Sequence, residues 1–149
     1  MDKLVRKILI DSQVYKEDEV LTTSIEELGE QSYKVTFLFP EYQRSKNPLD
    51  HISAVQMQAA LIEGLCCVVG CLVKKGTSNF PIDLESITNF LLYKESITFR
   101  KMLKPNEVSQ LYFQVGNICK IKLRRNFYSI SFTFKGFISG SCEALLEAF

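Results

Sequence analysis

The sequence predicts an α+β fold in which a curved antiparallel sheet wraps around one long central helix. The first observation is a long apolar segment, Ala54 to Val73, in which the only strongly polar side chains are Gln56, Gln58 and Glu63. A helix that is apolar almost all round has to be surrounded by protein on nearly every side. The second observation is that strand patterns lie on both sides of this segment, and strands that curl around the helix can surround it.

The apolar segment also has the length of a membrane span, which needs about 20 mainly apolar residues. Glu63 lies in its middle, and an ionised carboxylate at the centre of a bilayer is costly. We therefore predict no membrane span.

The chain of 149 residues fits one domain, residues 1–149. Eighteen basic and 17 acidic residues leave a net charge of +1 with no long run of one sign. Charge therefore predicts no nucleic-acid partner. The first 11 residues hold too short an apolar stretch for a signal peptide, so we expect a cytoplasmic protein.

The N-terminal third predicts a short helix followed by a hairpin. Residues 3–10 have a short helical pattern. Residues 19–28 and 32–39 have strand patterns, and Gly29 provides a turn signal between them. Pro40 ends the second strand, because proline lacks the N–H group that a strand ladder uses.

The long helix has recognisable ends. Asp50 or Ser53 is the expected N-terminal cap, since both side chains can accept a hydrogen bond from the first turn. Lys74, Lys75 and Gly76 are typical of a helix C-terminus.

After the helix the remaining pattern is that of strands. Turn signals separate four of them, at 88–103, 108–125, 127–136 and 137–149. The short connections predict a meander of antiparallel strands.

One face of the long helix consists of small residues. Ala60, Gly64, Cys67 and Cys71 recur at spacings of four, three and four, which places them on one side of a helix. Small side chains permit close approach of a sheet, so we expect the sheet to curl tightly around the helix. That arrangement is the hotdog fold.

The cysteines predict neither disulfides nor a metal site. Their number, five, is odd, and three of them crowd the apolar helix, where they are typical of small hydrophobic residues. The chain has no Cys-x-x-Cys pair and one histidine, which is too little for a Cys/His zinc set. We expect no metal and no cofactor.

Three motifs resemble those of one family. They are Tyr42-Gln-Arg-Ser45, His51-Ile-Ser-Ala-Val55 and Phe99-Arg-Lys-Met-Leu-Lys-Pro105. In this order they resemble motifs of the FcoT-like long-chain fatty acyl-CoA thioesterases, a hotdog-fold family, and the resemblance extends from about residue 33 to the C-terminus.

The resemblance implies a hotdog dimer with a tunnel for an acyl thioester between the subunits. The substrate would be an acyl-CoA or acyl-carrier-protein thioester, and Tyr42 matches a tyrosine on which the family relies. The family's helix asparagine falls on Ile62 and the following glutamine on Glu63, so the chain departs from the family where chemistry is expected.

The resemblance, together with this departure from it, leaves three functions open. The first is hydrolysis of a fatty acyl thioester. The second is a lyase reaction, either conjugate addition of glycine to a 2-enoyl thioester or dehydration of a 3-hydroxyacyl thioester. The third is an acyl-binding module without catalytic activity.

Glu63 is a candidate general base. Gln56 and Glu63 are seven residues apart and share a helix face, so together they would line the mouth of a thioester site. A desolvated carboxylate there would have a raised pKa and would accept a proton from water or an amine. The alternatives are a carboxylate at the one wet edge of the helix, or one paired with a buried arginine.

His51 is a second catalytic candidate. It is the one histidine of the chain, and an imidazole suits proton transfer near neutral pH. It also precedes the helix where hotdog dehydratases keep a catalytic histidine. The alternative is a structural hydrogen-bond donor in a loop.

The helix start itself is a candidate binding site. Backbone N–H groups around Ser53, Ala54 and Val55 lack partners within the helix and lie at its positive end. They would hold a thioester oxygen in an oxyanion hole, which serves hydrolysis, dehydration and conjugate addition alike.

Arg100 and Lys101, with Lys104, form a basic cluster near a strand end. They would bind the phosphates of coenzyme A or of an acyl-carrier arm, although a solvated strand end is the simpler explanation.

Segment 77–85 is expected to cover one end of an acyl tunnel. We also expect a homodimer or a higher even oligomer, because a single sheet exposes an edge strand that a second copy can pair with.

Overall fold

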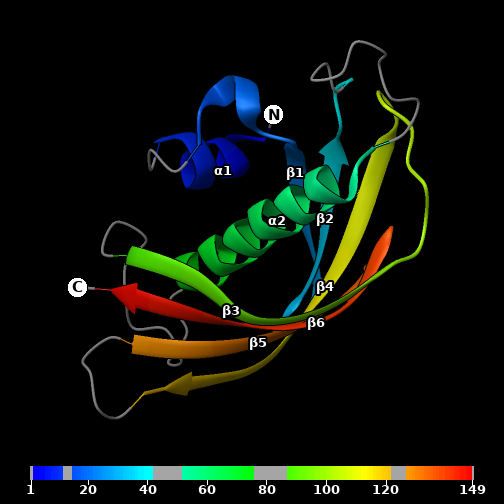
Figure 1. Cartoon of the computed structure of the whole chain (residues 1–149). Coiled ribbons are helices and arrows are strands. Elements are labelled where there is room, and N and C mark those ends of the chain that lie inside the picture. The colour runs from blue at the N-terminus through cyan, green and yellow to red at the C-terminus, as the bar shows by residue number, and fades with distance from the viewer. Residues whose placement is uncertain (1, 12–14, 42–51, 76–86, 122–126, 149) are drawn as a thin grey trace.

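The computed structural model describes residues 2–11, 15–41, 52–75, 87–121 and 127–148. Its main feature is a six-stranded antiparallel sheet that curves around one long helix, as Figure 1 shows. The prediction of an α+β fold with a central helix is confirmed.

The strand order across the sheet is β1-β2-β4-β5-β6-β3. Every neighbouring pair is antiparallel. The strands are β1 (Thr22–Gly29), β2 (Ser32–Leu38), β3 (Ile87–Phe99), β4 (Val108–Lys120), β5 (Phe127–Gly136) and β6 (Ile138–Ala148).

The predicted hairpin is confirmed, but the predicted four-strand meander is wrong for its first strand. Strands β4, β5 and β6 do form a meander. Strand β3 instead pairs with β6, because β2 already pairs with residues 108–114 of β4. Strand β3 also ends at Phe99, since the next two N–H groups both donate to the carbonyl oxygen of Phe137 at the β5–β6 turn.

The long helix is α2 (Ala54–Lys74). Ser53 is its N-terminal cap, as predicted, and Lys75 is its C-terminal cap. Twelve of its side chains or glycines are buried, including Glu63. In the part of the chain that the structure describes, α2 is the one helix long and apolar enough to cross a membrane, and most of it is buried inside the protein. It is the core helix of this fold.

Gly64 allows the sheet to approach α2 closely. A Cβ atom on Gly64 would lie 2.7 Å from the ring of Phe113 in β4 and 3.2 Å from the ring of Phe37 in β2. Two parts of the chain cover the small helix face, because Cys67 packs in a cluster with Val5 and Leu9 of the N-terminal segment. The expected close approach of the sheet is therefore found at Gly64, and the N-terminal segment covers the face at Cys67.

The N-terminal segment covers a second side of α2 (Figure 1). It consists of α1 (Lys3–Arg6), a π-helical turn η1 (Lys7–Asp11) and a 3₁₀ turn η2 (Glu17–Glu19). A Cβ atom on Gly70 of α2 would lie 2.5 Å from Cδ1 of Ile8. The predicted helix at 3–10 is thus confirmed, and its burial explains why α2 is apolar on more than its sheet-facing side.

Candidate functional site

The start of α2 carries a capping box made by two residues predicted to bind substrate. The N–H group of Gln56 donates to Oγ of Ser53 at 3.3 Å, and the N–H group of Ser53 donates to Oε1 of Gln56 at 3.2 Å. These two residues therefore satisfy each other and fix the first turn of the helix.

Two N–H groups of this turn stay free. Within the described residues, the N–H groups of Ala54 and Val55 have no acceptor. Both residues are exposed, and the Val55 side chain is 75% accessible. They lie at the positive end of a 21-residue helix, so this turn can accept a partially negative oxygen from outside the chain.

Apolar side chains surround this end of the helix. The N–H group of Ile52 donates to the carbonyl oxygen of Leu103 at 2.7 Å, which ties the β3–β4 connection to the helix start. Met102 on that connection is 78% accessible. Leu38 and Val108, which pair at the adjoining ends of β2 and β4, are also exposed.

Arg100 and Lys101 begin the same connection. Both side chains are exposed, and Nε of Arg100 donates to Oγ of Ser139 at 2.7 Å. The structure therefore places this basic pair on the segment that leads to Leu103, whose carbonyl oxygen accepts the N–H group of Ile52 just before α2.

Tyr42 and His51 lie outside the described residues, as does segment 77–85. Their roles stay predictions.

Glu63 occupies an environment that differs from both structural alternatives considered for it. Its side chain is 2% accessible, so it does not lie at a wet edge. Its carboxylate accepts the N–H groups of Leu21 at 3.0 Å and Thr22 at 2.9 Å, and the Thr22 hydroxyl at 2.9 Å. No arginine or lysine of the described residues forms an ion pair with it.

The carboxylate of Glu63 thus fastens the start of β1 to α2. Burial raises its pKa, and the bonds from Thr22 and Leu21 act in the opposite direction. Desolvation, with a smaller contribution from Glu63, raises the pKa of the partly buried Cys66 thiol to about 12. The donors to the carboxylate that the structure shows are Leu21 and Thr22 of this chain. The role of Glu63 as a general base stays a prediction.

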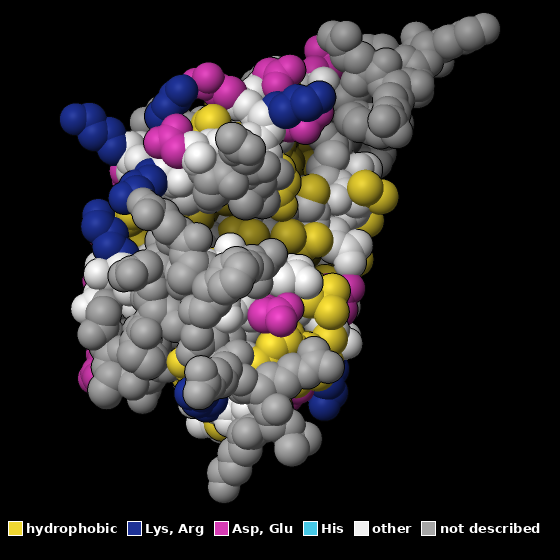
Figure 2. Space-filling model, turned by 90° about the vertical axis from the view of Figure 1, so that its left-hand side faces the viewer, with side chains coloured by type: hydrophobic (Ala, Val, Ile, Leu, Met, Phe, Trp, Pro, Cys, Tyr) yellow, Lys and Arg dark blue, Asp and Glu magenta, His cyan; other side chains and the backbone are white. Residues whose placement is uncertain are grey.

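Sequence reasoning missed a polar pair on the uncovered side of α2. Nε2 of Gln58 donates to Oε1 of Glu95 in β3 at 2.7 Å. The pair lies beside a stripe of α2 that neither the sheet nor the N-terminal segment covers completely: Val55, Ala59, Ile62 and Cys66. Figure 2 shows hydrophobic side chains gathered in a hollow of the surface between charged side chains. Helical spacing could have marked Gln58, but the register of β3 could not be known in advance.

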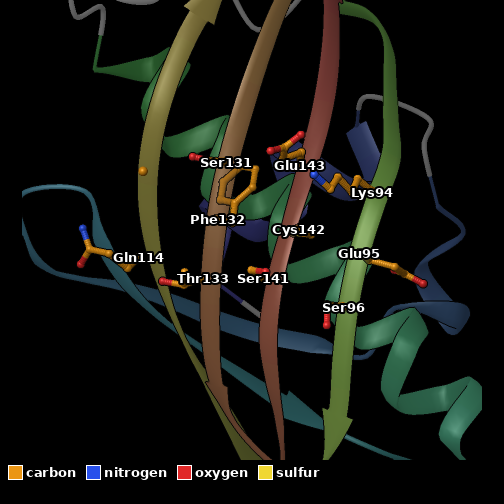
Figure 3. Close-up of a pocket in the computed structure, with 11 residues that line it drawn as sticks. Lys94, Glu95, Ser96, Gln114, Ser131, Phe132, Thr133, Ser141, Cys142 and Glu143 are labelled. Atoms are coloured by element: carbon orange, nitrogen blue, oxygen red, sulfur yellow. The ribbon is translucent and has the colours of Figure 1, made fainter.

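The sheet face turned away from α2 has a cavity of its own. Its volume is about 380 Å³, and it is lined by residues of β3, β4, β5 and β6. In Figure 3 hydroxyl side chains of Ser131, Thr133 and Ser141 line it, while Glu95 points past the edge strand. A neighbouring cavity of about 450 Å³ lies along β2, β4 and β5. Neither lining includes a site residue predicted from the sequence.

No protein family model and no curated protein matches the chain. Solved structures do. The chain is similar to a thioesterase family protein from Silicibacter pomeroyi, with a TM-score of 0.57 and 10% identity over 99% of this chain and 98% of that one. It is also similar to the dehydratase heterocomplex ApeI:P from Xenorhabdus doucetiae, with a TM-score of 0.58 and 8% identity over 87% and 84% of the two chains.

A third similar structure is a hypothetical thioesterase protein with coenzyme A from Streptococcus pneumoniae TIGR4. Its TM-score is 0.50, with 11% identity over 84% of this chain and 88% of that one. At these identities the likeness shows the fold. The chain has a hotdog fold.

Proposed function

We propose that this protein is an enzyme that processes acyl thioesters, and that its reaction is hydrolysis of a fatty acyl-CoA or acyl-carrier-protein thioester. The observation that carries the proposal is the exposed pair of free N–H groups at Ala54 and Val55, at the start of the central helix. The similar structures include proteins described as thioesterases, one of them with coenzyme A.

The chemistry begins with the thioester carbonyl oxygen placed at these two N–H groups. Attack on the carbonyl carbon turns this oxygen into an oxyanion, which preorganised N–H donors stabilise more than they stabilise the ground state. Removing one such donor typically costs about 10²–10³ in kcat. The main-chain N–H groups at the helix start would therefore supply a substantial part of the rate enhancement without any side chain.

The surroundings of the helix start suit the two ends of such a substrate. The exposed apolar side chains Val55 and Met102 would contact the acyl chain. Arg100 and Lys101, on the same connection, would bind the phosphates of coenzyme A or of a carrier arm. We keep Tyr42 and His51 as catalytic candidates.

We also propose that the protein is a homodimer or a higher even oligomer. Strand β3 is an edge of the sheet and runs from Ile87 to Phe99, which leaves a long row of backbone groups for a second copy to pair with. Leu91, Tyr93 and Phe99 are exposed on it. The uncovered stripe of α2 beside β3 would be buried by the same contact, and the site would lie between subunits.

The thiols favour a reducing compartment. All five cysteines are free, and Cys67 and Cys142 are buried. Because secreted proteins usually oxidise their cysteines to disulfides, we propose a cytoplasmic location.

A lyase reaction is the second candidate, since one similar structure is a dehydratase heterocomplex. An oxyanion site stabilises an enolate as well as a tetrahedral intermediate. Dehydration of a 3-hydroxyacyl thioester, or addition of glycine to a 2-enoyl thioester, would use the same helix start.

The test is a mass-spectrometric screen of the purified protein against saturated, 3-hydroxyacyl and 2-enoyl thioesters, with and without glycine. Hydrolysis predicts a free acid and a free thiol from the saturated substrate. An enoyl product or a glycine adduct would support the lyase reaction instead. Tight binding of every substrate without any product would contradict the enzyme proposal and support an acyl-binding module.

A further inference from the structure

The Gln58–Glu95 pair connects the first half of α2 to the edge strand. Gln58 is four residues after Ala54, so both lie on one side of the helix, about 6 Å apart along its axis. Helical side chains lean toward the N-terminus, which brings the Gln58 amide closer to the free N–H groups. Glu95 accepts a hydrogen bond from this amide at 2.7 Å.

Glu95 differs from the other carboxylates that contact α2. Glu63 is buried and its oxygens accept donors from Leu21 and Thr22. Glu27 pairs with Lys75 beyond the far end of the helix. Glu95 is exposed, and in the described part of the chain only its Oε1 has a recorded hydrogen-bond partner. Its second oxygen is therefore available to a molecule that approaches the helix start.

We infer that Glu95 is the general base of the thioester site and that Gln58 is the residue that positions it. The inference rests on the proposed function and deepens it. Glu95 accepts a proton from a water molecule while the water oxygen forms a bond to the thioester carbonyl carbon. When the tetrahedral intermediate collapses, the carbon–sulfur bond breaks and the thiolate leaves. The proton on Glu95 then passes to the thiolate sulfur, so that the carboxylate is restored.

The geometry explains why the base is on a strand. A base on α2 near the free N–H groups would have its carboxylate at the positive end of the same helix, where it would compete with the oxyanion for those donors. A carboxylate on β3 approaches from the side. The amide of Gln58, a neutral hydrogen-bond donor, holds it there.

The test compares matched glutamate variants of the purified protein with a saturated acyl-CoA as the substrate. Glu95→Gln keeps the shape of the side chain and removes its basicity, and we expect kcat to fall by about 10²–10⁴ while the thermal midpoint stays unchanged. Glu143→Gln is the control. Glu143 is a half-buried glutamate of the neighbouring strand β6, and it accepts a hydrogen bond from the Tyr93 hydroxyl at 2.6 Å, away from α2. We expect this variant to keep the wild-type rate.

Gln58 is tested separately because it acts through Glu95. Gln58→Ala frees the carboxylate, and we expect a loss of kcat smaller than that of Glu95→Gln, with little change in KM. Gln58→Asn has a shorter side chain that does not extend to Glu95, and we expect it to lose as much kcat as Gln58→Ala. A wild-type kcat in Gln58→Ala would overturn the positioning role.

The two proposals fail in different ways. If the wild-type protein turns over thioesters and Glu95→Gln retains more than half of its kcat, Glu95 is not the base, and the proposed function stands. If the wild-type protein turns over no thioester, the proposed function is overturned and this inference with it.

Discussion

The hydrogen bonds to Glu63 predict that the carboxylate is a structural acceptor whose loss destabilises the fold. Glu63→Met keeps the length of the side chain and removes both oxygens. In the wild type the N–H groups of Leu21 and Thr22 donate to Oε2 of Glu63 at 3.0 and 2.9 Å. The variant leaves both N–H groups without an acceptor inside the protein. An unsatisfied buried donor costs about 1–3 kcal/mol, so two of them cost about 2–6 kcal/mol.

Part of this loss is offset because the variant no longer buries a charge. A free-energy change of a few kcal/mol lowers the thermal midpoint of a chain of this size by on the order of 10 °C. Glu63→Gln is the matched comparison. One amide oxygen can still accept from Thr22, and only the weaker contact of Oε1 with the Leu21 N–H group, at 3.2 Å, is lost. We expect it to retain most of the stability.

The assays are thermal unfolding and hydrogen exchange at two amides. Exchange at Leu21 and Thr22 should accelerate in Glu63→Met and stay slow in Glu63→Gln. If Glu63→Met unfolds at the wild-type midpoint with unchanged exchange at both amides, the carboxylate does not hold β1, and the reasoning is refuted. A large fall in turnover in Glu63→Gln, with full stability, would instead support Glu63 as the general base.

The difference in unfolding free energy between the wild type and Glu63→Gln should depend on pH in a defined direction. Burial raises the pKa of Glu63 in the folded protein above its ordinary value of 4.5. The folded state therefore binds the proton more readily than the unfolded state does. The contribution of Glu63 to stability is largest below the ordinary value and declines as the pH rises through the folded-state pKa. The unfolding free energy of the wild type relative to Glu63→Gln should accordingly increase on acidification.

Three further predictions concern packing and assembly. Gly64→Ala should cost about 1–3 kcal/mol in unfolding free energy, because its Cβ atom would lie 2.7 Å from the Phe113 ring; unchanged stability in urea would show that the sheet can move away. Gly70→Ala brings a Cβ atom to 2.5 Å from the flexible end of Ile8, so its cost should be partly relieved when Ile8→Ala is added; strictly additive losses would contradict this contact. Leu91→Lys on the exposed face of β3 should shift sedimentation from about twice the mass of 17.1 kDa toward the single chain; a wild-type protein that is already monomeric would remove the shared interface.

Local signals explain how much of the fold was predictable. The alternation in residues 32–39, the turn that follows Gly29 and the cap at Ser53 each depend on neighbours in the sequence, and each was confirmed. The place of β3 was not predictable in this way. It depends on β2 having taken the edge of β4, which is a pairing between segments far apart in the chain.

The candidate site shows the same division. The free N–H groups at Ala54 and Val55 follow from helix geometry alone and could be predicted. The partners of Glu63 could not, since two of its three donors are main-chain N–H groups 41 and 42 positions away, which any residue type other than proline could provide. The Gln58–Glu95 contact joins residues 37 positions apart, and it depends on the register of a strand with two irregularities.

The most direct measurement of the central claim, that the start of α2 binds the thioester oxygen, is the kcat of Ala54→Pro. Ala54 is the first helical residue, where proline is well tolerated, and Ser53 already has the extended conformation that a following proline requires, with φ −72° and ψ 157°. The substitution therefore removes one free N–H group and leaves the helix intact, while Ala54→Ser keeps the N–H group and is the control. We predict that Ala54→Pro lowers kcat by about 10²–10³ at an unchanged thermal midpoint and that Ala54→Ser has the wild-type rate. A wild-type kcat in Ala54→Pro would contradict the account.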